Sequence, residues 1–132
     1  MGERNGEAHC YCYGSLGDVN QSFGECNKAR EHFEKCLAIR KQMGDRNGEA
    51  QCYGSLAVVY QSVGGHDYAI EHLKKASVIH RQNGAKQGVY NCCHSLAISF
   101  LALGKYPKAI EYNKKALTIA LETGHRAGEA ES

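Results

Sequence analysis

Apolar side chains in the middle of the chain recur at the spacing expected for one face of a helix. Two such sets lie on either side of Gly64-Gly65, and their members are Tyr53, Leu56, Ala57 and Tyr60, then Ala69, Ile70, Leu73, Ala76 and Ile79. Residues three and four apart share a helical face, so the pattern predicts two amphipathic helices joined by a glycine turn. Neither helix can bury its apolar face alone, and we expect both to pack on each other and on further helices.

The same pattern returns before and after this pair of helices, at an interval of forty residues. The matching positions are Leu16, Leu56 and Leu96; Gly24, Gly64 and Gly104; and Ala29, Ala69 and Ala109. Self-similarity at a fixed period of about 20–50 residues is typical of repeat architectures. We therefore divide residues 1–132, as a single domain, into repeats at 2–43, 44–83 and 84–123 and a partial fourth repeat at 124–132.

Each complete repeat is expected to contain two helices. Their predicted ranges are 5–22, 26–42, 47–63, 67–82, 87–103 and 107–122. The side chain of Asp45 can cap the helix that follows it. Gly44, Gly84 and Gly124 can adopt the left-handed conformation that ends a helix, so we expect a turn at each of these three positions.

The repeats resemble those of the tetratricopeptide repeat (TPR) family. In that family the first helix carries an aromatic residue, Leu, a small residue and Tyr, and the second carries two Ala around a large residue. The middle repeat matches this pattern with Tyr53, Leu56, Ala57, Tyr60, Ala69, Leu73 and Ala76. The resemblance implies an all-α fold, a right-handed superhelical stack of three helix-turn-helix pairs (an α-solenoid) with a truncated fourth first helix.

The length of the repeat points to a subset of this family. A TPR is usually about 34 residues long, whereas the period here is forty. The longer period and the junction Gly44–Ala50, which reads GDRNGEA, resemble the Pins/LGN-like group of animal scaffold proteins.

In TPR proteins the first helices of successive repeats line a concave groove that holds a peptide or helix of a partner protein. The resemblance therefore implies a non-enzymatic protein-interaction scaffold. The groove residues expected from alignment on the central leucine are Tyr11, Asp18, Gln21, Gln51, Val58, Gln61, Asn91, His94, Ile98 and Leu101. As an alternative, Val58, Ile98 and Leu101 belong to the core and touch the opposite helix.

Two glycines, Gly14 and Gly54, are expected on the same face. A glycine inside a helix costs roughly 1 kcal/mol relative to Ala, so each requires a reason. We expect close approach between neighbouring helices at both positions, and backbone exposed to a ligand is the alternative. The basic residues with which chaperone-binding TPRs hold a terminal carboxylate do not occur at the expected groove positions.

Net charge and hydropathy narrow the class of partner. The formal charge of +2 is too small to favour nucleic acid or an anionic membrane. The third repeat is more basic than the others, with Lys86, Lys105, Lys108, Lys114 and Lys115 against Glu111 and Glu122, which is typical of a solvated face. The longest apolar stretch, 96–103, is too short to span a bilayer. We expect a protein or peptide as the partner.

The seven cysteines are an odd number and occupy core-like or helical positions. In a sequence without a recognisable secretory segment, this pattern predicts reduced thiols and a cytoplasmic location. We expect all seven to be unpaired in the native protein, with Cys36 and Cys52 buried.

No arrangement of residues in the sequence supports catalysis or metal binding. Cys93-His94-Ser95 places a thiol, an imidazole and a hydroxyl side by side, but consecutive helical side chains point about 100° apart and cannot form a nucleophile–base pair. His32 and Cys36 share a helical face, as do His9 and Cys12, but each pair offers only two ligands. We therefore predict no enzymatic activity, no metal and no cofactor.

The last predicted helix carries an apolar stripe without a partner. Ile110, Leu117 and Leu121 lie where the first helix of a fourth repeat belongs, and residues 124–132 are too few and too polar to cover them. Each such side chain left in water forfeits about 1.5–3 kcal/mol. The alternative function is therefore a self-assembling structural unit. A second chain covers the stripe head-to-tail or, as we prefer, about the twofold axis of a homodimer.

Overall fold

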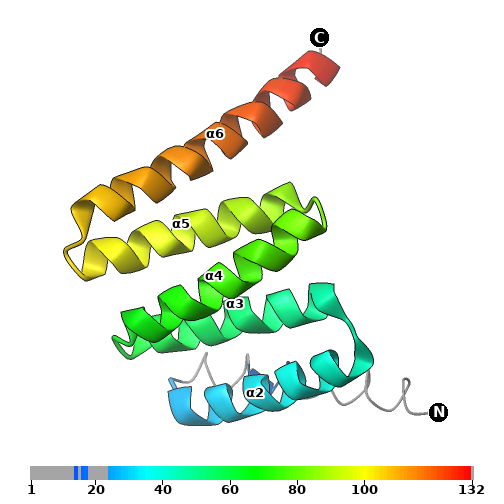
Figure 1. Cartoon of the computed structure of the whole chain (residues 1–132), viewed down its shortest axis with the longest axis vertical. Helices are drawn as coiled ribbons and strands as arrows, with labels where there is room; N and C mark the ends of the chain where they lie inside the picture. Colours follow the sequence, from blue (N-terminus) through cyan, green and yellow to red (C-terminus); the bar gives the residue numbers. More distant parts are fainter. Residues whose placement is uncertain (1–13, 15, 18–23, 132) are drawn as a thin grey trace.

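The computed structural model describes residues 14, 16–17 and 24–131, with side chains as far as residue 123. Its helices after residue 24 are α2 (Cys26–Met43), α3 (Arg46–Ser62), α4 (His66–Gln82), α5 (Lys86–Ala102) and α6 (Tyr106–Glu131). They are stacked in chain order along the longest axis of the molecule (Figure 1), and each packs on the next helix in the chain. The predicted all-α stack of helix pairs is confirmed.

Glycines in the left-handed conformation end the helices at intervals of twenty residues. The dihedral angle φ is positive at Gly24, Gly44, Gly64, Gly84 and Gly104. After α2, the N–H groups of Gly44 and Asp45 donate to the carbonyls of Lys41 (3.1 Å) and Arg40 (3.0 Å), which satisfies acceptors that have no partner inside the helix. The predicted bounds of α2 to α5 agree with the observed bounds within one residue.

The end of α6 differs from the prediction. We expected Gly124 to end this helix, but α6 continues through it to Glu131 (Figure 1). The residues after Gly124 include Arg126, Ala127, Glu129 and Ala130, which are strong helix formers and offset the cost of one glycine. Because no further helix packs on α6 in the described part of the chain, nothing forces the backbone to turn there.

The second helices of the first two repeats, α2 and α4, bury their apolar faces under the first helix of the next repeat. Leu56 of α3 packs with Phe33 of α2, and Leu96 of α5 packs with Leu73 of α4. Both leucines are 1% exposed, whereas Leu16 at the same position of the first repeat is 47% exposed. The repeat pattern treats these three leucines as equivalent, but the described residues include no helix before Leu16 that corresponds to α2 or α4.

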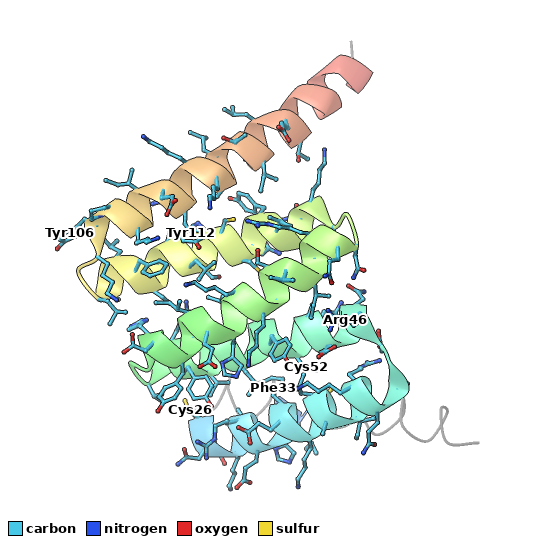
Figure 2. The ribbon with its side chains drawn as sticks, in the orientation of Figure 1. Cys26, Phe33, Arg46, Cys52, Tyr106 and Tyr112 are labelled. Carbon is cyan, nitrogen blue, oxygen red and sulfur yellow. The ribbon has the colours of Figure 1, made fainter. Side chains whose placement is uncertain are left out.

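Hydrogen bonds and ion pairs between charged side chains stabilise the junction between α2 and α3. Asp45 accepts a hydrogen bond from the N–H of Gly48 at 3.0 Å, which confirms the predicted cap, and its other carboxylate oxygen pairs with Arg40 at 2.6 Å. Arg46, labelled in Figure 2, pairs with Glu49 at 3.1 Å. The Gly44–Ala50 motif therefore has a structural role, because it begins α3 and ties that helix to α2.

The cysteines described by the structure all belong to helices α2, α3 and α5. The expected burial of Cys36 and Cys52 is confirmed, and their Sγ atoms are 3.4 Å apart, too far for a disulfide bond between them. Cys26, Cys92 and Cys93 are free thiols. Cys10 and Cys12, which we also expect to be reduced, lie outside the described residues. None of the described helices is long and apolar enough to cross a membrane.

Replacement of Gly54 by alanine should stabilise the protein by about 1 kcal/mol, because glycine is a poor residue inside a helix and no atom lies within 4 Å of the position that a Cβ would take. The matched variant Gly48→Ala should instead destabilise it, since the new Cβ would lie 2.5 Å from Cδ of Arg40 and 2.5 Å from a carboxylate oxygen of Asp45. Urea unfolding measures both changes. A Gly48→Ala variant with the same free energy of unfolding as the wild type would contradict the close contact of Gly48 with Arg40 and Asp45.

Alkylation at pH 8 should modify Cys26 faster than Cys92. The thiolate is the reactive form, and burial, assisted by the charge of neighbouring Cys93, raises the pKa of Cys92 to about 11. The rate at Cys92 should therefore keep rising between pH 8 and 11, and denaturation should remove the difference between the two sites. Peptide mapping by mass spectrometry gives both rates, and equal rates in the native protein would refute the expectation.

Candidate functional site

The first helices α3 and α5 expose a row of aliphatic side chains at positions predicted for the groove. Val58, Ile98 and Leu101 are 44%, 46% and 55% exposed. These values contradict the interpretation as core residues, because a core residue in contact with an opposite helix would be covered. The three side chains are therefore available to a partner.

A pocket of about 420 Å³ lies between α3, α4 and α5, and Gln51, Val58 and Asn91 are among the predicted residues that line it. The remaining lining residues are Ala50, Gly54, Leu73, Ala76, His80, Gly88, Cys92 and Ser95. The structure thus brings three predicted residues together, while His94, Ile98 and Leu101 do not line this pocket. Tyr11, Asp18 and Gln21 lie outside the described residues.

Gln61 has an internal role that its sequence position did not reveal. Its side-chain amide donates to the carbonyl of Ser95 at 3.2 Å and to Oγ of Ser99 at 2.8 Å. Ser99 is fully buried on α5, so this amide fastens α3 to α5. A partner could use the side-chain nitrogen of Gln61 as a donor only in competition with these two hydrogen bonds.

The three residues Cys93-His94-Ser95 diverge as expected for a helix. Cys93 is buried, whereas His94 is exposed and its ring stacks on Tyr90, with centroids 6.1 Å apart and planes within 2°. Within the residues that the structure describes, no three His, Cys, Asp or Glu side chains gather as metal ligands.

Gly54 opens the pocket instead of packing against a helix. No atom lies within 4 Å of the Cβ position at Gly54 or at Gly14, so the expectation of close helix approach is wrong for both residues. Gly54 lines the pocket, which leaves the backbone of α3 accessible there. The alternative interpretation, backbone exposed to a ligand, agrees with this geometry.

His80 of α4 lines the pocket and was not predicted from the sequence. Its Nδ1 is buried without a hydrogen-bond partner among the described residues, and burial lowers its pKa. The ring also lies against Gly88, where an added Cβ would collide with it. Only the contact between α4 and α5 reveals this residue, because His80 belongs to a second helix and the groove pattern considers first helices alone.

Beyond their first residues, Arg46 and Lys86, helices α3 and α5 carry almost no formal charge. In the ranges 47–63 and 87–104 the single acidic or basic side chain other than His94 is Glu49, which is buried and paired with Arg46. The exposed side chains are amides such as Gln51 and Asn91 or aliphatic groups such as Ile98. The face is therefore suited to an uncharged segment of another molecule.

Solved structures confirm the fold. The TPR domain of FLU from Arabidopsis superposes with a TM-score of 0.83 at 19% identity, over 89% of this chain and 98% of that chain. MamA superposes with a TM-score of 0.73 at 27% identity, over 88% of this chain and 61% of that chain. No curated protein matches the sequence.

The sequence matches the family model of the tetratricopeptide repeat twice, over residues 11–82 and 48–122. Together the two matches span both helices of the second repeat and most of its neighbours. The family is that of a structural repeat, and no enzyme family is indicated. The chain belongs to the tetratricopeptide repeat family.

Proposed function

We propose that the protein is a non-enzymatic interaction module that binds a peptide or helix of a partner protein on the concave face of α3 and α5. The observation that supports this function is the exposure of Val58, Ile98 and Leu101 along a face that also holds the 420 Å³ pocket. Exposed aliphatic groups beside a concave site are typical of protein-binding surfaces.

The chemistry of this face indicates how a partner would be held. Covering the exposed half of an aliphatic side chain contributes about 1 kcal/mol, so Val58, Ile98 and Leu101 together would supply a large part of the affinity. Gln51 and Asn91 each offer an amide donor and acceptor that can pair with a peptide backbone. Because the face lacks formal charge, we expect binding to change little with ionic strength.

The double substitution Val58→Arg and Ile98→Arg should abolish capture of partners by the immobilised protein, because two buried charges would replace aliphatic contacts. Val78→Arg is the matched control, since Val78 is an exposed aliphatic residue of α4 outside this face. The measurement is a quantitative pull-down at low and high salt. A partner retained equally by all three proteins would exclude the face of α3 and α5 as its binding site.

A second candidate function is self-association through α6. Ile110, Leu117 and Leu121 are 54%, 58% and 63% exposed, whereas Ile70 and Ser77, forty residues before the first two, are 8% and 7% exposed beneath α5. The positions of α4 that α5 covers are therefore equivalent to positions of α6 that no described helix covers. We propose that two chains place their α6 faces together about a twofold axis.

Leu117→Glu should shift the protein toward the monomer, because a carboxylate in the centre of the α6 face would be desolvated in a dimer. Light scattering over a concentration series measures the mass of the wild type and the variant, with Val78→Glu as the control. A wild type that remains monomeric at the highest concentration would eliminate this candidate and leave binding to α3 and α5.

We also propose a subgroup of the family and a cellular compartment for this protein. The forty-residue period and the Gly44–Ala50 junction favour membership of the Pins/LGN-like group within the TPR family. The abundance of thiols favours a reducing compartment, the cytoplasm.

A further inference from the structure

The two inter-repeat junctions of the molecule place cations at matching positions. Lys41, Arg46 and Lys75 surround the junction between α2, α3 and α4. Forty residues later Arg81, Lys86 and Lys115 take the same places around the junction between α4, α5 and α6. The internal repeat therefore allows one junction to serve as the reference for the other.

In the first junction the positive charges are matched by an acid and an aromatic ring. Arg46 pairs with Glu49 at 3.1 Å. The ammonium groups of Lys41 and Lys75 lie 5.6 Å and 5.7 Å from the ring centroid of Tyr53, within the range of cation–π attraction. Each cation of this junction thus has a favourable partner inside the chain.

In the second junction the partners are replaced and the cations remain. Ala85, Val89 and Cys93 stand where the first junction has Asp45, Glu49 and Tyr53. Among the ion pairs of the described residues, none involves Arg81, Lys86 or Lys115. Lys115 retains a ring contact with Tyr112 at 4.7 Å.

The second junction also encloses more space than the first, where a single hollow of about 230 Å³ is lined by the equivalent positions Arg46, Glu49, Tyr53, Lys75, Val78 and Ile79. Two adjoining hollows of about 290 Å³ and 360 Å³ share Arg81, Val89 and Ile119. Lys86 and Glu122 line the first hollow, and Lys115, Cys93 and Thr118 line the second. Three cations and one carboxylate therefore surround a floor that is formed by aliphatic side chains.

This site lies on the other side of α5 from the concave face, although His80 lines both the first hollow and the concave pocket. Val89 and Cys93 are one helical turn apart and lie on the side of α5 opposite to Asn91 and Ile98, because residues two apart on a helix point about 200° apart. Both Arg81 and Lys115 act electrostatically on the Cys93 thiol and partly offset the rise in its pKa that burial causes. Both cations line the second hollow together with Cys93.

We propose that this junction is a binding site for a carboxylate attached to an aliphatic group. Arg81 can hold a carboxylate through two parallel hydrogen bonds, and Lys86 and Lys115 add positive charge. Val89 and Ile119 cover the aliphatic part. Two sources offer this chemistry, an acidic and aliphatic segment of a partner protein or a free alkyl carboxylic acid.

The test uses the whole chain and two fluorescein-labelled, end-blocked peptides, one with two glutamates between leucines and one with glutamines in their place. Fluorescence anisotropy at low salt should show binding of the glutamate peptide only, and the affinity should fall as salt rises. Arg81→Gln with Lys86→Gln should weaken binding about tenfold. The control Lys105→Gln, at the opposite end of α6, should leave it unchanged.

A second variant tests the site without removing its cations. Val89→Glu with Cys93→Tyr rebuilds the acid and the ring that pair with the cations of the first junction, so it should weaken binding while circular dichroism shows an intact fold. Val58→Arg with Ile98→Arg should leave binding unchanged, which separates this site from the concave face.

Octanoate identifies the source of the ligand. Displacement of the peptide by octanoate, or binding of octanoate alone in a titration followed by NMR, supports a free alkyl acid. Peptide binding that octanoate does not displace supports a protein segment. Equal affinity for the two peptides, unchanged affinity in the Arg81 and Lys86 variant, or no binding of either peptide or octanoate would overturn the proposal.

Discussion

Burial of one helix face by the next helix in the chain is the interaction on which the structure depends. Leu56 covers Phe33 and Leu96 covers Leu73, so every repeat completes the core of the repeat before it. Such a stack has no central core, and its stability is a sum over neighbouring contacts. The same rule explains the exposure of Ile110, since no described helix follows α6.

The regular spacing of the turns places each helix in the same position relative to the helix before it. A left-handed glycine every twenty residues returns each helix to the same position relative to its neighbour. The polar chemistry around the turns is less uniform. Asp45 caps α3, whereas α5 begins after Ala85 without any side-chain cap. Tertiary burial of α5 therefore compensates for a missing cap, whose contribution is about 1 kcal/mol.

Helix α5 carries two surfaces of different character on opposite sides. One side, with Asn91 and Ile98, is neutral and continues the exposed face of α3. The other side meets the cations Arg81 and Lys115 across a hollow lined by Val89. A first helix inside a solenoid contacts helices on its flanks and leaves room for a ligand at more than one place, so one repeat can combine a scaffold contact with a charge-selective contact.

The sequence by itself determined the repeat, the family, the burial of Cys36 and Cys52 and nearly all helix bounds, because periodicity and glycine spacing are local properties. Tertiary structure decided the rest. It showed that Val58 is exposed, that Gly54 opens a pocket and that Gln61 is bonded to Ser99. A periodic pattern identifies the apolar face of a helix, but it does not say which neighbour covers that face or whether one is present. The continuation of α6 through Gly124 has the same cause, since a glycine ends a helix only where packing makes the chain turn.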